Sequence, residues 1–365
     1  FFCTFYPEFN RIYGNKLKGV KRLTVKVGQK NEYFLSCQSA QGLQTFLQDA
    51  LRLIKQVYII KGGSTQTRSR IVRYIGLSLM DKGYDIDIVR GVINPDNLEG
   101  IIIPGLSLAL ICGEKYYELP FKSSDAKLKL INLDQFRDDE KYLIYKSKIK
   151  DIIEQVNVNL ELVQEEIRKA RLVYLDYCSQ GLEMEERQVL YITEKLLKTL
   201  FTSEEGKMNH RFAQGITGCG IIDFYPKILE GIIKRHYLNG IKYLNSSGIL
   251  KLIAREAVIR GLTVDVYHNC LDISIVELLI LPEVKLAIGG KDFTGDFQRL
   301  INYKKIEKKI EPVNIKNINL SEAIKLLSEV DKLNEEISIL FHEILDFAQI
   351  EKVEACLLSE IISKL

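Results

Sequence analysis

Glycine, hydroxyl and basic side chains follow a short β-rich run at residues 57–60, in an order similar to a phosphate-binding loop. The working pattern is G-x-x-x-x-G-K-[ST]: glycines let backbone N–H groups surround a phosphate, the lysine reaches its outer oxygens, and the hydroxyl holds Mg²⁺. Here the segment reads Gly62-Gly63-Ser64-Thr65-Gln66-Thr67-Arg68-Ser69. The first glycine and the hydroxyl are present, so the candidate nucleotide-binding residues are Gly62, Gly63, Thr67, Arg68 and Ser69.

Two replacements weaken the phosphate chemistry of this loop. Thr67 stands at the second glycine, and a β-branched residue resists the left-handed backbone that glycine adopts. Arg68 stands at the lysine, and its planar guanidinium is not interchangeable with an ammonium at a fitted site. We therefore expect ATP with Mg²⁺ to bind here weakly or not at all.

A second segment stands at the matching place later in the chain and departs further from the pattern. It reads Gly240-Ile241-Lys242-Tyr243-Leu244-Asn245-Ser246-Ser247. Only Gly240 and Ser247 keep their places, and we add both to the candidate residues. A serine replaces the lysine, and bulky side chains fill the loop.

An internal repeat relates the two segments. At an offset of 178, residues 34–112 align with residues 212–290 without a gap, and 16 of the 79 positions are identical. The identical pairs include Phe34/Phe212, Gly62/Gly240, Ser69/Ser247, Asp87/Asp265, Glu99/Glu277 and Pro104/Pro282. Glycines and a proline coincide where backbone geometry is most demanding, so the match indicates a shared structure.

Each copy has the pattern of a βαβ unit. In the first, the run at 57–60 precedes a helical spacing of Ile71, Ile75 and Leu79, and apolar runs at 84–89 and 106–112 follow. We therefore predict an α/β fold of two tandem P-loop-NTPase-like domains, each with a mainly parallel sheet flanked by helices. The predicted boundaries are 1–203 and 204–365.

Long helical patterns follow each core. Apolar residues recur at three-and-four spacing over residues 149–167 and again over residues 337–361. We expect these helices to cover the sheets, with a coiled arm or a dimer interface as alternatives.

Composition narrows the classes of partner. The chain has 365 residues, is 46% hydrophobic and carries a net charge of +3, as an ordinary globular protein does. Its seven cysteines form no C-x-x-C pair and no apolar run is long enough to span a bilayer, so we expect a cytoplasmic protein without a zinc site or membrane contact. In the basic stretch from Arg11 to Lys30 the aromatics do not alternate with the charges in a binding pattern, so an exposed strand face is favoured over a nucleic-acid-binding patch.

Other polar residues offer alternative sites. Asp96 and Glu99 in the first copy, and Asp272 and Glu277 in the second, precede an apolar strand where a carboxylate can bind a metal or act as a base. A helix-start or loop acid is the simpler interpretation, although both copies keep the Glu99/Glu277 pair. His236 and His268 have the surroundings of structural histidines.

The chain resembles tandem P-loop ATPase-like proteins of Firmicutes over nearly its whole length. The resemblance lies in residues 206–220, in residues 101–104 and 279–282 before and at each proline, and in residues 131–133. It implies an intact phosphate loop in each half and an acid ending the later strand. Here the acid positions fall on Cys112 and Gly290.

Two functions follow as hypotheses. The first is a degenerate, non-catalytic or weakly nucleotide-binding scaffold or regulator with an unidentified protein partner. The alternative is an ATPase or nucleotide-kinase-like phosphotransferase that uses Arg68 and Ser69, because phosphoryl transfer depends on positioning and electrostatics. The loss of loop chemistry in both halves favours the first.

Overall fold

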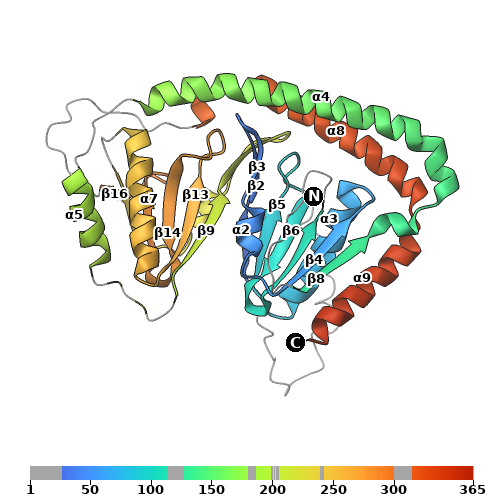
Figure 1. The fold of residues 1–365 in the computed structure, drawn as a ribbon, viewed down its shortest axis with the longest axis horizontal. Helices are drawn as coiled ribbons and strands as arrows, with labels where there is room; N and C mark the ends of the chain where they lie inside the picture. Colours follow the sequence, from blue (N-terminus) through green and yellow to red (C-terminus); the bar gives the residue numbers. More distant parts are fainter. Residues whose placement is uncertain are drawn as a thin grey trace, which may run out of the picture.

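Two α/β lobes lie beneath a pair of long helices (Figure 1). The computed structural model describes residues 27–113, 127–179, 186–198, 200, 202, 205–238, 242–299 and 315–364. Most of the basic Arg11–Lys30 stretch and Gly240 lie outside these residues. In the part of the chain that is described, no helix combines the length and apolar character that crossing a bilayer requires.

The first lobe is built on a six-stranded sheet. In spatial order its strands are β1 (Lys30–Tyr33), β5 (Ile86–Arg90), β6 (Leu98–Ile103), β7 (Leu108–Cys112), β4 (Gln56–Lys61) and β8 (Lys127–Asn132). The second sheet repeats this order with β9 (Lys207–Phe212), β13 (Thr263–His268), β14 (Val276–Leu281), β15 (Leu286–Gly289), β12 (Lys234–Tyr237) and the two-residue β16 (Gln298–Arg299). The strand order therefore follows the sequence repeat.

Both sheets are mixed, so the prediction of mainly parallel sheets is wrong. β6 runs antiparallel to β5 and β7, and β14 runs antiparallel to β13 and β15. The cause is the short 3-10 turns η1 (Pro104–Leu106) and η3 (Pro282–Val284), since a connection this short can only join antiparallel strands. Each turn ends on a left-handed residue, Ser107 or Lys285. The α/β class is confirmed, and the P-loop arrangement stays a prediction.

Helices cover both faces of each sheet. α3 (Thr65–Asp81) and α7 (Tyr243–Ile259) pack on one face, and the short α2 (Leu47–Leu51) and α6 (Tyr225–Ile228) on the other. Alternate strand residues point to opposite faces, so Tyr58 and Ile60 join one core cluster while Val57 and Ile59 join another. The predicted helix over Ile71, Ile75 and Leu79 is confirmed.

The lobes meet about an approximate two-fold axis. The equivalent residues Phe34 and Phe212 pair through two backbone hydrogen bonds of 3.0 and 2.8 Å. Two hairpins lie beside this pair, β2 (Ser36–Ser39) with β3 (Gly42–Thr45), and β10 (Gln214–Thr217) with β11 (Gly220–Asp223). The N–H of Ala40 donates to Leu271 and that of Gly218 donates to Ile93, which are again equivalent positions.

The helices after each core pack on the opposite lobe. α4 (Asp139–Cys178) follows the 3-10 turn η2 (Leu133–Phe136) and leads to α5 (Glu186–Leu197), whose Val189 and Leu197 join the core around α7. α8 (Ser321–Ile344) follows η4 (Ile315–Asn317) and leads to α9 (Phe347–Ile362), which packs in the core around α3. α4 extends over both lobes, and α8 lies beside its first half, over the first lobe (Figure 1). The division predicted at residue 203 thus separates the sequence repeats, while the packed cores exchange helices across it.

This exchange makes the first lobe depend on the end of the chain. Ile350 of α9 is fully buried in the α3 core, so Ile350→Ala should lower the free energy of unfolding by about 2–5 kcal/mol. Ile339→Ala on α8, at a side chain that is 64% exposed, should change it by no more than about 0.5 kcal/mol. Denaturant unfolding of both variants tests this, and equal effects would contradict the exchange.

Candidate functional site

The first candidate loop is shorter than its sequence pattern predicts. β4 ends at Lys61 and α3 begins at Thr65, which leaves only residues 62–64 between strand and helix. Gly62 and Gly63 have positive φ angles of 77° and 60°, which explains the glycines. Ser64 caps the helix by accepting a hydrogen bond from the Thr67 N–H. Thr67, Arg68 and Ser69 therefore lie in the first turns of α3.

The Asp134 carboxylate accepts a hydrogen bond from a loop N–H that a bound phosphate would need. The N–H of Gly63 donates to Asp134 Oδ1 at 3.0 Å, and a Cβ built on Gly62 would lie 2.7 Å from the same carboxylate. The same Cβ would lie 2.8 Å from Asn132 Oδ1, which accepts a hydrogen bond from the Asp134 N–H. Asn132 is the last residue of β8 and Asp134 lies in the turn η2 that follows, and sequence reasoning did not assign them to the site.

Arg68 points back at its own loop. Its Nη1 donates to the carbonyls of Gly62 and Gly63 at 3.0 and 3.1 Å, and its Nη2 donates to Thr65 Oγ1 at 3.1 Å. The side chain is buried, at 7% exposure. In this position the guanidinium holds the loop carbonyls, whereas the lysine of a working loop would reach outward to a phosphate.

Ser69 and Ser247 each accept the same kind of structural hydrogen bond, one in each lobe. Ser69 Oγ accepts from the Leu98 N–H and Ser247 Oγ accepts from the Val276 N–H, each at 2.8 Å. Both hydroxyls are buried and tie a helix to the first residue of the antiparallel strand. This bond accounts for the identity of the two residues without a metal ion. Around Ser247, α7 begins at Tyr243, and Ser246 Oγ donates to the Lys242 carbonyl.

Protein groups bind the carboxylates of two of the four candidate acids, Glu277 and Asp272. Glu277 is buried and accepts from Tyr225 Oη at 2.7 Å and Asn269 Nδ2 at 3.0 Å. Burial would raise the pKa of Asp272, but hydrogen bonds from Ser274 and Arg171 outweigh it and lower the pKa. Asp96 is exposed, and its N–H donates to Asn94 Oδ1.

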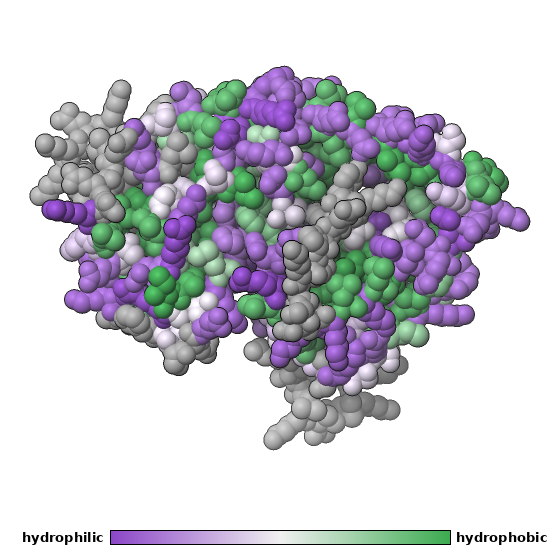
Figure 2. Space-filling view, viewed as in Figure 1, coloured by the Kyte–Doolittle hydropathy of each residue, from purple (hydrophilic) through white to green (hydrophobic). Residues whose placement is uncertain are grey.

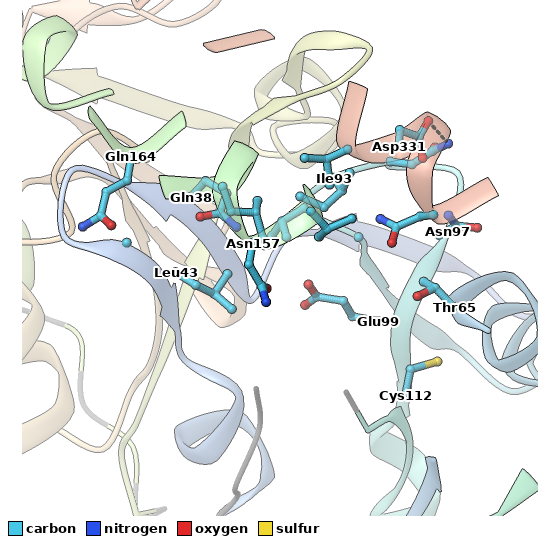
Figure 3. Close-up of a pocket in the computed structure, with 18 of the residues that line it drawn as sticks. Gln38, Leu43, Thr65, Ile93, Asn97, Glu99, Cys112, Asn157, Gln164 and Asp331 are labelled. Carbon is cyan, nitrogen blue, oxygen red and sulfur yellow. Dashed lines mark hydrogen bonds between the residues drawn. The ribbon is translucent and has the colours of Figure 1, made fainter. Parts of the chain in front are cut away.

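Glu99 lines a cavity of about 460 Å³ (Figure 3). The cavity lies at the carboxyl ends of β5 and β7, and α4 and α8 form its far wall. In open α/β sheets ligands bind at this edge. Among the described residues, no group of three or more His, Cys, Asp and Glu side chains is arranged to hold a metal ion.

The two histidines differ from each other. His268 Nδ1 donates to the Ile273 carbonyl at 2.7 Å and its Nε2 faces His210 Nδ1 at 2.8 Å, so it is a structural residue as predicted. Burial lowers the pKa of His268 to about 4, with His210 and Lys251 adding to the fall and Glu277 opposing it. Burial also lowers the pKa of His236 on β12.

Comparison of the chain with protein-family models, with curated proteins and with solved structures gives no match. The resemblance to tandem P-loop ATPase-like proteins therefore rests on the sequence, and its implied activity stays a prediction.

The contribution of each serine hydrogen bond to stability can be tested separately in the two halves. Ser69→Ala and Ser247→Ala each leave a buried strand N–H without an acceptor, so each should lower the free energy of unfolding by about 1–3 kcal/mol. Ser78→Ala, further along α3, removes a hydroxyl that only donates to a helix carbonyl and should cost less than about 0.5 kcal/mol. Denaturation with and without Mg²⁺ measures this; a loss that appears only with Mg²⁺ would show a metal role.

Stability should also depend on His268. Its folded pKa is depressed from 6.5 to about 4, so stability is complete above pH 6.5 and is lost as the pH falls, because only the unfolded chain takes up the proton. The loss should approach about 3 kcal/mol near pH 4. Denaturation from pH 7 downward measures it. His268→Gln should flatten this slope and the exposed control His342→Gln should keep it; an unchanged slope in His268→Gln would contradict the assignment.

Proposed function

We propose that this chain is a non-catalytic scaffold or regulator in which both former nucleotide loops serve as structural starts of helices. The observation that carries the proposal is the closure of the first loop by Arg68 and Asp134. A nucleotide phosphate there would meet a carboxylate, and the nearest cation is engaged with loop carbonyls. Phosphate binding would therefore require the loop to exchange its own hydrogen bonds and to separate like charges.

The surface of α4 supports a scaffold role. Along its outer side it exposes apolar side chains at Ile144, Val158, Leu162 and Val173, which are 49–74% exposed. Their spacing places them on one face of the helix. Figure 2 shows apolar patches between the polar ones along the upper edge, where α4 runs. Exposed apolar surface of this kind is typical of sites that bind a protein partner.

The competing enzyme hypothesis makes a different demand on the same residues. An ATPase or phosphotransferase would need Arg68 to leave the carbonyls of residues 62 and 63 and reach a phosphate, and Ser69 Oγ to turn from the Leu98 N–H toward Mg²⁺. Arg70 and Arg73 stand nearby, but Arg70 forms an ion pair with Glu354 of α9 at 2.7 Å.

The two functions are separated by a thermal-shift titration with Mg-ATP and Mg-GTP. We expect no rise in Tm at millimolar nucleotide, since binding to the folded state would have to raise it. Arg68→Ala should lower Tm equally with and without nucleotide, because it removes the contacts that hold the loop. Arg73→Ala, which removes an exposed charge near the loop, should leave Tm nearly unchanged. A nucleotide-dependent rise in Tm that Arg68→Ala abolishes would overturn the proposal and favour the enzyme.

A further inference from the structure

The first sheet ends on one side at β8, and among the described residues no strand pairs with the outer edge of β8 (Figure 1). The Lys127 N–H donates to the Lys55 carbonyl, just before β4, at 2.9 Å. In a parallel pair, the backbone groups of alternate residues point to the neighbouring strand. The N–H and C=O groups of Leu128 and Leu130 therefore point away from β4 and form a row with which a further strand can pair.

On the face that α2 covers, this edge is apolar. Two rows of apolar side chains cross β7, β4 and β8 on that face, with Ala109, Val57 and Leu128 in one row and Ile111, Ile59 and Leu130 in the other. The members from β7 and β4 are at most 9% exposed and belong to the core under α2. Leu128 and Leu130, by contrast, are 46% and 50% exposed. Apolar side chains on an added strand would continue both rows and cover these leucines.

The opposite face of the same edge lies next to α9. Lys129 forms an ion pair with Glu360 of α9, and the buried Ile131 belongs to the core around α3, so these alternate residues of β8 share that face. A groove of about 300 Å³ lies between β8 and α9, and Lys129 and Lys352 both line it. Lys127 adds a further exposed ammonium group on this face.

Positive charge prevails along this groove. Glu360 is the one carboxylate among its described lining residues, and it is paired with Lys129 and, at 2.8 Å, with Lys364. Hydrogen bonds from these two lysines lower the pKa of Glu360 to about 2. The ammonium groups of Lys127 and Lys352 are exposed in addition. Acidic side chains on a partner therefore complement this face.

We propose that the outer edge of β8 binds an extended segment of a partner protein in which apolar and acidic side chains alternate. Main-chain hydrogen bonds to Leu128 and Leu130 would hold the segment as an additional strand. Because successive residues of a strand point to opposite faces, its apolar side chains would cover the two leucines and its acidic side chains would face Lys129 and Lys352. A second copy of β8 would bring the same lysines to the same face, and like charges oppose that pairing. The site is separate from the closed loop and from α4, so its test does not depend on the proposed function.

The test titrates the full chain with three capped peptides of six residues, the length of β8. One alternates valine with glutamate, one valine with lysine, and one serine with glutamate. Calorimetry at about 0.15 M salt should give saturable binding of the first peptide only. The serine peptide controls for attraction of any acidic chain to the net charge of +3. No saturable binding of the valine–glutamate peptide, or equal binding of either other peptide, would overturn the proposal.

Hydrogen exchange locates the bound peptide. The outward N–H groups of β8 become hydrogen-bonded when a strand is added, so exchange in residues 127–132 should slow on binding. Slowed exchange in another segment, with residues 127–132 unchanged, would place the peptide elsewhere and contradict the proposal.

Two pairs of variants separate the backbone contact from the charge. Leu130→Pro removes an outward N–H, which an edge strand tolerates, and should abolish binding while the Tm without peptide changes little; Leu130→Val keeps the N–H and should retain binding. Lys352→Glu should weaken binding about three- to tenfold, and Lys332→Glu, at an exposed position of α8, should leave it unchanged. Equal binding by the proline and valine variants would overturn the proposal. Dimerisation of the full chain that Leu130→Pro abolishes would assign the edge to a second copy and overturn it as well.

Discussion

The junction of the two lobes depends on one partly buried arginine. Arg211 lies 3.4 Å from Asp265 and 3.7 Å from Asp87, the equivalent carboxylates of the two sheets, and its guanidinium stacks over the ring of Tyr33 at 4.3 Å. Tyr33 is itself the repeat equivalent of Arg211, and its hydroxyl donates to Asp87 at 3.0 Å. Arginine at both positions would bring two like charges together across the approximate two-fold axis, and tyrosine at both would leave two buried carboxylates without a cation. The two copies must therefore differ at this position for the lobes to pack.

The two copies also differ at the neighbouring positions further from the axis. Glu32 forms ion pairs with Arg90 at 2.7 Å and with Lys227 at 2.6 Å, so despite its burial its pKa falls to about 2. The equivalents of Glu32 and Arg90 are His210 and His268, which form a neutral hydrogen-bonded pair. Once the lobes are fixed in this way, α4 and α8 can cross to the opposite cores. Each half then completes the hydrophobic core of the other, and neither repeat is an independent packing unit.

Part of this organisation was readable from the sequence. The repeat offset predicted equivalent strands, and the periodicity of Ile71, Ile75 and Leu79 predicted α3, because glycines and apolar spacing report local geometry directly. The antiparallel β6 was missed because the run around Ile101–Ile103 carries no sign of strand direction; only the short turn at Pro104 sets it. The closure of the first loop was missed because Asp134 comes from a strand end 71 residues away. One signal was present: Asn132 and Asn319 recur in the repeat, and each side chain accepts from the N–H two residues on.

The repeat keeps a pair of serines and a pair of glutamates, and the two pairs differ in how far their surroundings agree between the lobes. Ser69 and Ser247 are kept because each satisfies a strand N–H, so their retention carries no information about nucleotides. Glu99 and Glu277 are kept although the packing of a sheet does not require a carboxylate, and a buried carboxylate needs donors. The second lobe meets that need with a lysine and three neutral donors, which makes Glu277 part of its core. In the first lobe, Gly91 and Gly113 stand at the positions of Asn269 and Lys291, and Glu99 lines a cavity. The two serines therefore have the same surroundings in both lobes, whereas the two glutamates do not.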